Sequence, residues 1–521
     1  MGSKLVRGSF IIFLGNIIFR LGGWIYRFIM ATILGPALYG ILGITLPFQG
    51  IFQTLAAGGL PPAIAKYVAE YEALDKKDMA RQTIYTSLKI MIFLGIFLGF
   101  IMVFYAAPWL ANVYLHKPIA LIPLQLVGLV TPFSVIVGAF RGAFQGVYKM
   151  EYILYTRALE QLGMILFGVA FVLLGFSVAG ALWGTVLGFA SASLLAIYIF
   201  RKYMGKYIPK PSPDFIFTIR DELKLAWMLI KYSVPVIITA IAEMGIYNIC
   251  TLVMGTFLAS EAIGYFAAAD PIARLPLMIS ISIATTILPA ASEAFAIKSK
   301  KTLQKYVSKA YVYSMLFVVP MCIGISLFSE PILEIFYFTN SAYTLGATSL
   351  AILAIGMTFY SIFSISTSIV QGVGNPRVPM YILVLGAILT FVLCWYMIPI
   401  YGIAGGAAAT TIACFAMMVP ILYFSFRLTD TKPPVIDISK ILLASLIMSL
   451  VSLIIPKTPI GLIIAGVVCS VVYLFSLILF RFFSKDDLDN FRDYSRKFGP
   501  LASLLNKLIN FVERIEFRNN K

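Results

Sequence analysis

Apolar residues occur along most of this chain in blocks of about 20, separated by short polar stretches. A helix rises 1.5 Å per residue, so a block of this length crosses a hydrocarbon core of about 30 Å. Backbone polar groups in lipid must pair within their own segment, and a helix achieves this. The pattern therefore predicts an all-α integral membrane protein with about 14 transmembrane helices.

The expected spans cover residues 9–33, 39–60, 84–107, 119–140, 153–175, 178–200, 231–256, 262–290, 310–329, 346–370, 378–399, 402–426, 440–456 and 459–480. The first block follows Lys4 and Arg7 but lacks a small-residue cleavage site. We therefore expect it to be a retained span rather than a cleaved signal peptide.

Composition supports the membrane assignment. Of the 521 residues, 60% are hydrophobic and only 12% are charged, compared with about 25% charged residues in an ordinary soluble domain. The five cysteines all fall within expected spans and form no CxxC or Cys/His pattern. We therefore expect no disulfide framework, no metal site and no cofactor.

The basic residues predict the orientation of the chain. Of the 40 Lys and Arg residues, only Lys117 and Lys457 fall on one side, while Arg20, Arg27 and Arg274 lie deep within spans. Because basic connections stay inside, both termini are expected in the cytoplasm, with the protein in the plasma membrane. The net charge of +17 then marks a rim that faces anionic inner-leaflet lipids, and nucleic acid is not an expected partner.

The chain also predicts an internal duplication. Sliding it on itself by about 225 residues aligns Leu34, Gly40 and Pro47 with Leu258, Gly264 and Pro271. Each half holds six spans, so both enter the membrane in the same orientation, related by a pseudo-two-fold axis along the membrane normal. The expected organisation is an N-lobe (1–224, spans 1–6), a C-lobe (225–435, spans 7–12), spans 13–14 (436–481) and a cytoplasmic amphipathic tail (482–521).

Two stretches carry a resemblance to a known family. They are LGPALYGILGITLPFQGIFQTLAAGGLPPAIAKYVAEY (34–71) and QGVGNPRVPMYILVLGAILTFVLCWYMIPIYGIAGGAAATTI (371–412). Both resemble the polysaccharide-transporter branch of the multidrug/oligosaccharidyl-lipid/polysaccharide exporter superfamily, in particular its stage V sporulation protein B-like and O-unit flippase-like members. The resemblance implies a two-lobed, V-shaped transporter that alternates between inward-open and outward-open states and is not an enzyme.

Charges within the spans are candidates for function, because a charge at mid-membrane costs about 2.5–3.5 kcal/mol. Arg20 and Arg27 lie two helical turns apart on span 1, and Asn16 precedes Arg20 by one turn. Arg20 is near mid-bilayer, which favours a cavity-lining role over a buried ion pair. Arg27 is nearer the outer surface and could also extend to water. Arg157 and Glu160, near the cytoplasmic end of span 5, are expected to form an interfacial pair.

Three further charged residues, a pair on span 8 and one residue on span 7, have two possible roles. Asp270 and Arg274 are four residues apart on span 8, with Pro271 between them as an expected kink. Either they neutralise each other, or Arg274 points into a cleft and Asp270 orients it. Glu243, in the middle of span 7, either pairs with Arg20 across the lobes or carries a coupling proton.

The cations on spans 1 and 8 predict a water-filled cleft suited to phosphate or pyrophosphate, which Arg binds bidentately. The resemblance adds that lipid II flippases place arginines on their first and eighth spans, at positions that Arg20, Arg27 and Arg274 resemble. Span 2 here departs from that pattern, because it offers only Gln49 and Gln53. We therefore expect a monomeric flippase that moves a polyprenyl (pyro)phosphate-linked oligosaccharide from the cytoplasmic to the outer leaflet, with H⁺ or Na⁺ as candidate coupling ions.

Two alternatives stay open. A drug- or cation-antiporting exporter of the same superfamily should carry carboxylates in its cleft, whereas span 1 has two arginines and no acid. A membrane glycosyltransferase or ligase needs acidic residues at the membrane face. The expected external connections hold Glu261, Glu330 and Glu334 in no DxD-like arrangement.

Spans 13 and 14 lie outside the duplication and are almost uncharged. In the related lipid II flippases an additional pair forms a hydrophobic groove. The resemblance therefore assigns this pair to the lipid tail of the substrate.

Overall fold

The computed structural model describes residues 2–209 and 215–483, and the side chains of residues 2–21, 73 and 206 lie outside that description. Within these ranges the chain forms helices and connecting turns, with no β-strand. The all-α fold is thereby confirmed. The expected amphipathic tail, residues 482–521, lies almost wholly outside the described residues.

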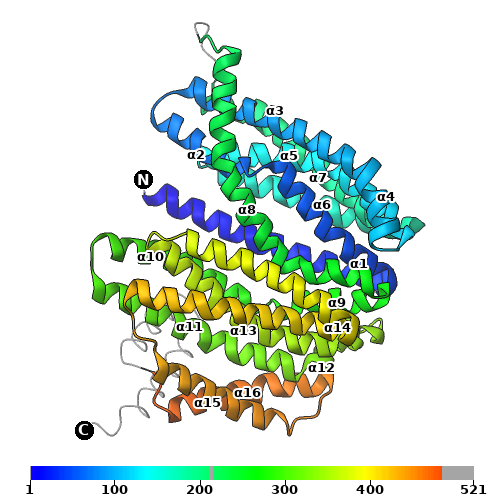
Figure 1. The fold of residues 1–521 in the computed structure, drawn as a ribbon, viewed down its shortest axis with the longest axis vertical. Helices are drawn as coiled ribbons and strands as arrows, with labels where there is room; N and C mark the ends of the chain where they lie inside the picture. The colour runs from blue at the N-terminus through cyan, green and yellow to red at the C-terminus, as the bar shows by residue number, and fades with distance from the viewer. Residues whose placement is uncertain (1, 210–214, 484–521) are drawn as a thin grey trace. The chain divides into compact units, whose positions relative to one another are not determined.

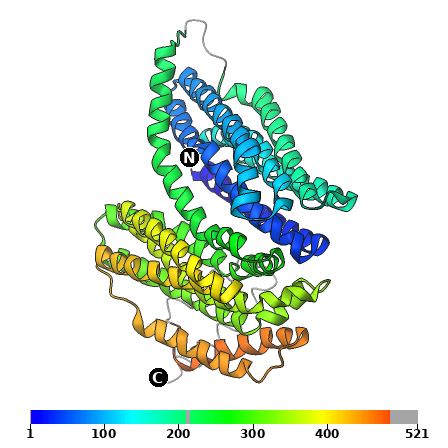
Figure 2. The same ribbon diagram turned by 45° about the vertical axis from the view of Figure 1, so that its right-hand side comes forward.

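The chain divides into two compact units, each drawn in Figures 1 and 2. The first consists of Met1–Pro271, Phe336–Gly346 and Leu383–Thr410, and the second of Ile272–Ile335, Ala347–Ile382 and Thr411–Lys521. These units are defined by contacts, whereas the expected lobes are defined by sequence equivalence. The lobe boundaries therefore stay a prediction.

The first unit holds α1 (Gly2–Ala57), α2 (Leu60–Ala73), α3 (Lys77–Ile101), α4 (Ala107–Trp109), α5 (Leu121–Gly146), α6 (Met150–Phe171), α7 (Ser177–Tyr203), α8 (Ile219–Phe257) and α9 (Ser260–Ala273). The second holds α10 (Leu277–Ala296), α11 (Lys300–Leu327), most of α12 (Ser329–Phe336), α13 (Ala347–Gly372), α15 (Val435–Ser452) and α16 (Pro459–Leu479). Helix α14 (Arg377–Thr429) contributes to both units.

Eleven helical segments among the described residues are long and apolar enough to cross a membrane. Three of them have 51 to 54 residues, more than twice the length that one crossing requires. Each of the three is broken at a glycine with positive φ, namely Gly35 (70°), Gly175 (93°) and Gly402 (58°). Residues with a Cβ rarely adopt this conformation, so glycine permits the chain to change direction there. The total of fourteen crossings stays a prediction.

The expected span 8 is not one continuous helix. Helix α9 ends at Ala273 and α10 begins at Leu277, with Pro276 as the residue before it. The expected kink at Pro271 is therefore wrong in position, because Pro271 lies inside α9 and the break follows it. Arg274 lies in this break, so Asp270 and Arg274 do not occupy one continuous helix.

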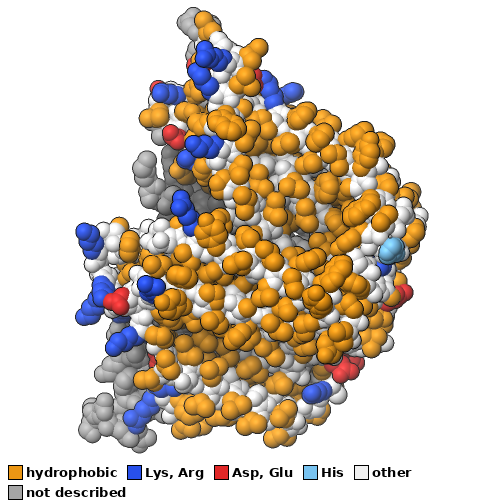
Figure 3. All heavy atoms as spheres, viewed as in Figure 1, with side chains coloured by type: hydrophobic (Ala, Val, Ile, Leu, Met, Phe, Trp, Pro, Cys, Tyr) orange, Lys and Arg blue, Asp and Glu red, His pale blue; other side chains and the backbone are white. Residues whose placement is uncertain are grey.

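Contacts within the first unit bring two of its polar connections together at one end. Arg81 Nη1 donates to the Ile208 carbonyl oxygen at 3.0 Å, and Lys89 Nζ lies 2.7 Å from Glu222 Oε1. These contacts put the α2–α3 and α7–α8 connections together. Figure 3 shows Lys and Arg side chains at the end of this unit where α8 begins, and the single histidine, pale blue, at the other end. This distribution is the one expected from the sequence, and the orientation in the membrane stays a prediction.

Helices α15 and α16 are separate and pack beside each other, with α15 on α11, and both views show them adjacent (Figures 1 and 2). A hydrogen bond joins α16 to α11, because Tyr473 Oη donates to the Leu316 carbonyl oxygen at 2.7 Å. That carbonyl lies four residues before Pro320, which has no N–H to donate to it. Tyr473 thus satisfies a carbonyl group that the helix cannot.

A buried ion pair joins α5 to α6. Arg141 Nη2 lies 2.7 Å from Glu160 Oε2, with exposed side-chain fractions of 17% and 4%, and Arg141 Nε donates to Thr156 Oγ1 at 3.0 Å. The Glu160 carboxylate reaches Arg141 on the neighbouring helix, a partner that the sequence did not predict, and Arg157 lies within electrostatic range of the same carboxylate. The expected pairing of Glu160 with Arg157 stays a prediction. A buried carboxylate needs such a partner because an isolated charge is costly away from water.

We expect Glu160→Gln to destabilise the protein by about 3–5 kcal/mol, because it leaves a buried arginine without its counter-charge. Thermal unfolding in detergent measures the loss. The matched control is Lys89→Met, which breaks a pair with exposed fractions of 67% and 28% and should cost at most about 1 kcal/mol. Equal losses in both variants would contradict this account.

Candidate functional site

Arg27 lies on the first arm of α1, before the break at Gly35, and its side chain is exposed. The guanidinium is within electrostatic range of the hydroxyl groups of Tyr26 and Tyr39, both of which are buried. An exposed arginine on a span must face either lipid headgroups or a water-filled space. The exposure of Arg27 is compatible with both of these surroundings, so its role in binding stays a prediction.

Asp270, on α9, is half-buried and lies within electrostatic range of Tyr39 and Cys250. Tyr39 thus has a cation and a carboxylate in its surroundings, contributed by α1 and α9 respectively. The first unit therefore brings Arg27 and Asp270 into one neighbourhood, which sequence spacing alone does not predict.

Arg274 is half-buried and belongs to the second unit, where Cys414 is within its electrostatic range. Asn16 and Arg20 lie on the helical backbone of α1, but their side chains are outside the described residues. A common cleft for Arg20, Arg27 and Arg274 therefore stays a prediction.

Glu243 lies on the central part of α8, eight residues after the in-helix Pro235. Its side chain is exposed, and no ion pair to it exists among the side chains that the structure describes. The expected pairing with Arg20 lies outside the described residues. An exposed carboxylate of this kind can accept a proton or a cation.

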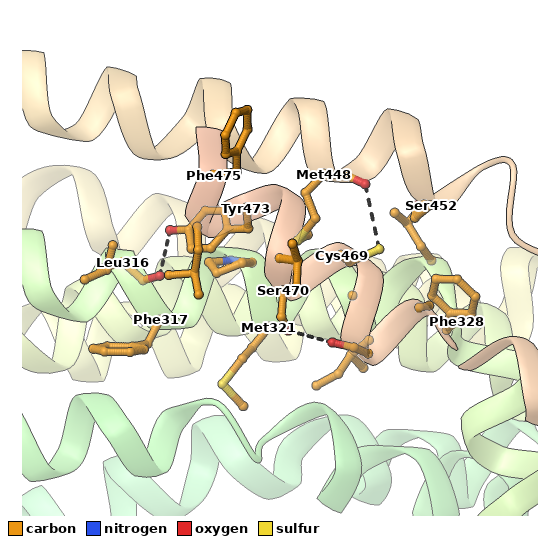
Figure 4. Close-up of a pocket in the computed structure, with 18 of the residues that line it drawn as sticks. Leu316, Phe317, Met321, Phe328, Met448, Ser452, Cys469, Ser470, Tyr473 and Phe475 are labelled. Carbon is orange, nitrogen blue, oxygen red and sulfur yellow. Dashed lines mark hydrogen bonds between the residues drawn. The ribbon is translucent and has the colours of Figure 1, made fainter. Parts of the chain in front are cut away.

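An apolar groove runs through the second unit, with a volume of about 850 Å³ (Figure 4). Its walls come from α11, α12, α15 and α16, and the figure shows side chains from these elements facing one another. Residues of the walls include Phe317, Met321, Gly324, Phe328, Ile332, Met448, Ser452, Leu462, Ala465, Gly466, Cys469, Ser470 and Tyr473.

The polar atoms in this groove are engaged with the protein backbone. Tyr473 Oη donates to Leu316, Ser470 Oγ donates to the Gly466 carbonyl at 2.6 Å, and Ser452 Oγ donates to the Ser449 carbonyl at 2.6 Å. The surface offered to a ligand is therefore hydrocarbon, with no charged group in the lining. Such a surface suits an alkyl or polyprenyl chain.

The additional helices that the resemblance assigned to a lipid tail thus form two walls of an apolar groove. The other two walls, from α11 and α12, were not expected. For these two walls the sequence gives one indication. The segment SEPILEIF, which forms the short helix α12, places polar residues between two apolar blocks and so indicates a break after Leu327.

Comparison with known proteins identifies the chain's relatives. The family model described as polysaccharide biosynthesis protein matches residues 5–295, more than half of the chain, and the MatE model matches residues 235–396. The lipid II flippase MurJ of Bacillus subtilis is 26% identical over 80% of this chain and 82% of its own length. The stage V sporulation protein B of the same organism is 25% identical over 65% of this chain and 67% of its own length. An uncharacterized membrane protein of Methanocaldococcus jannaschii, MJ1375, is 26% identical over 80% and 96%.

Solved structures share the fold. A lipid II flippase MurJ in an inward closed conformation superposes with a TM-score of 0.71 at 18% identity, covering 91% of this chain and 98% of its own. An inward-facing multidrug resistance MATE family transporter of the MOP superfamily superposes with a TM-score of 0.65 at 18% identity, covering 79% and 94%. The resemblance seen in the two sequence stretches is confirmed, and the chain belongs to the polysaccharide biosynthesis protein family.

Proposed function

We propose that the protein moves a polyprenyl (pyro)phosphate-linked oligosaccharide from the cytoplasmic to the outer leaflet by alternating access. It acts as a monomer in the plasma membrane with both termini in the cytoplasm. Relatives in the family are flippases, including the lipid II flippase MurJ and a probable low-salt glycan biosynthesis flippase of Haloferax volcanii. They carry out transport rather than a covalent reaction, which supports a transporter here.

The observation that carries the proposal is the apolar groove between α11–α12 and α15–α16. A water-soluble substrate gains nothing from such a surface, whereas each buried CH₂ of a lipid tail contributes about 0.8 kcal/mol. In a bilayer the gain is smaller, because the tail moves into the groove from lipid rather than from water. The groove therefore contributes more to the position of the tail than to the affinity for it. The added helices thus fit a substrate with a long apolar chain.

The arginines fit the other end of such a substrate. Arg27 is exposed on α1, Arg274 occupies the helix break before α10, and Arg20 precedes Arg27 by two turns. Arginine binds phosphate oxygens through two parallel N–H groups, and keeps its charge in an apolar environment. We propose that these arginines bind the phosphate or pyrophosphate group.

Glu243 favours a second candidate function, an exporter that couples to H⁺ or Na⁺. Its exposed carboxylate on α8 has no ion-pair partner among the described side chains. Coupling at Glu243 is compatible with a lipid-linked substrate, and it is also what a cation or drug antiporter requires. Transport of the lipid-linked sugar distinguishes the two.

Filling the groove should reduce transport. Gly466 lines it, and no atom lies within 4 Å of a Cβ placed there, so Gly466→Phe should be accepted by the fold and occupy the groove. Its neighbour Val467 is 64% exposed and is not part of the lining, which makes Val467→Phe the matched control. In proteoliposomes with a fluorescent polyprenyl pyrophosphate sugar we expect about tenfold slower transport in Gly466→Phe alone, a barrier change of about 1.4 kcal/mol. Equal rates in the two variants would exclude the groove from the tail's path.

Neutralising the arginines should weaken binding of the phosphate group. Each lost charge-assisted hydrogen bond costs about 1.5–3 kcal/mol, so Arg20→Ala and Arg274→Ala should each weaken substrate binding about 10- to 100-fold without loss of expression. Arg427→Ala is the control, because that exposed side chain contacts Tyr423 near the end of α14. Binding of a short-chain polyprenyl pyrophosphate to the purified protein gives the measurement. Full activity in the Arg20→Ala, Arg274→Ala double mutant would remove the proposed site.

The membrane potential should assist outward movement. One negative charge that crosses an inside-negative potential of 100 mV gains about 2.3 kcal/mol, so two uncompensated charges gain about 4–5 kcal/mol. In vesicles with an imposed inside-negative potential, wild-type protein should move the lipid-linked sugar outward faster. The acceleration disappears if a counter-ion travels with the substrate, so unchanged rates on collapsing the potential would exclude the electrophoretic mechanism while leaving the binding site untouched.

A further inference from the structure

Two helices of the first unit cross with their backbones in contact. A Cβ placed on Gly40, in the second arm of α1, would overlap the carbonyl oxygen of Ser260 at the start of α9. A Cβ placed on Gly264, in α9, would overlap the carbonyl oxygen of Pro36 at the start of that second arm. Glycine at these positions permits an approach that no other residue allows.

This crossing is reciprocal. The offset of 224 residues that relates Gly40 to Gly264 also relates Pro36 to Ser260. Gly40 therefore contacts Ser260, and Gly264 contacts Pro36, which is the residue equivalent to Ser260 in the other repeat. In the same register, a Cβ on Gly43 would lie 3.0 Å from the Ala267 Cβ, and these two residues are again 224 apart. Reciprocal contacts of this kind mark a two-fold axis, so the axis between the sequence repeats passes through this crossing.

On one side of the crossing, Lys117 joins the repeats. Its Nζ donates to the carbonyl oxygens of Gly255 at 2.8 Å and Leu258 at 2.9 Å, at the C-terminal end of α8. The last carbonyls of a helix have no partner within it and carry a partial negative charge, which an ammonium group satisfies. Burial lowers the pKa of Lys117, and the nearby Glu261 carboxylate opposes that shift.

On the other side, Tyr343 makes the equivalent contact. Its hydroxyl donates to the Ala31 carbonyl oxygen at 2.7 Å, near the end of the first arm of α1, and its side chain is fully buried. Ala31 and Gly255 are separated by the repeat offset of 224, and Lys117 and Tyr343 by 226. Lys117 belongs to the first repeat and bonds to the second, whereas Tyr343 belongs to the second and bonds to the first.

We propose that Lys117 and Tyr343 are a pair of crossed struts that hold the two repeats together at the end of the membrane domain opposite the basic rim. The struts flank the glycine crossing and must break when this end opens. They thus stabilise the state in which the substrate path is closed toward the outside. The inference rests on the proposed alternating access, and it does not depend on which substrate is carried.

The test measures how often this end opens. Ala267→Cys places a thiol one helical turn beyond Gly264, beside Gly43. Ala267 is partly exposed, so the parent protein gives a baseline labelling rate, and separation of the crossing should increase that rate. The full-length protein in right-side-out vesicles is treated with a membrane-impermeant thiol reagent, and the same protein without Ala267→Cys gives the background from the native cysteines. No substrate is present, so failure here is distinct from failure of the transport assay.

Removing a strut should increase labelling. We expect Lys117→Met and Tyr343→Phe each to raise the labelling rate of the thiol about tenfold, equal to about 1.4 kcal/mol, and the double variant to raise it further. Tyr343→Phe keeps the aromatic ring and removes one oxygen, so it tests the strut even if Lys117→Met lowers the yield of folded protein.

Two controls remove the same kind of donor group without removing a hydrogen bond between the repeats, and Tyr337→Phe keeps the ring contacts of Tyr337 with Phe28 and Tyr343. Lys457→Met removes an exposed lysine from the α15–α16 connection. Tyr337→Phe removes a hydroxyl that donates at 3.2 Å to the Ala268 carbonyl oxygen within the same repeat. Both should label at the parent rate. Unchanged labelling in the Lys117→Met, Tyr343→Phe double variant, or an equal rise in the controls, would overturn the proposal.

Discussion

Every backbone N–H and C=O group inside the hydrocarbon core must find a partner within the protein, because lipid offers none. Several features of the structure satisfy this constraint. Apolar blocks form helices, and the longest helical segments change direction at a glycine such as Gly35. Carbonyls that the helices leave free are satisfied by side chains from elsewhere: Tyr473 reaches Leu316 opposite Pro320, Tyr343 reaches Ala31 and Lys117 reaches Gly255. These three hydrogen bonds lie at helix ends or beside a proline, where a helix leaves a carbonyl group without a partner.

Sequence reasoning succeeded where length and composition decide the outcome. An apolar block of about 20 residues can only be a helix in lipid, and the described apolar blocks are helices. The duplication that Gly40 and Gly264 suggest stays a prediction. It failed where the outcome depends on the rotation of one helix against another. Helices α5 and α6 are joined by an ion pair between Arg141 and Glu160, which are 19 residues apart. Nothing in the local sequence shows that these two side chains face each other. The break at Arg274 was missed for a related reason, since Pro271 and Pro276 are equally able to end a helix and only packing selects between them.

The candidate site separates two kinds of environment. Arg27 and Asp270 both lie within electrostatic range of the buried Tyr39 in the first unit. The groove of the second unit presents hydrocarbon, with its few polar atoms turned to the backbone. The arginines stand out in the sequence because charge is rare in a span. The two groove walls from α15 and α16 were suggested by the family resemblance, whereas the walls from α11 and α12 were not, because their sequences look like those of other lipid-facing helices.

The glycine crossing has a consequence for how the two repeats can diverge. At the crossing, backbone meets backbone, so Gly40 and Gly264 admit no other side chain, and neither repeat can change without separating the helices. At the struts, the requirement is only a donor long enough to reach a carbonyl oxygen, and a lysine serves on one side while a tyrosine serves on the other. The two repeats therefore carry the same residue at the crossing, where there is no room for a side chain, and different residues at the struts, where any donor of sufficient length can reach the carbonyl oxygen. Under the proposed duplication, the two repeats share a glycine at the crossing and differ only in the donor that each sends to the other repeat.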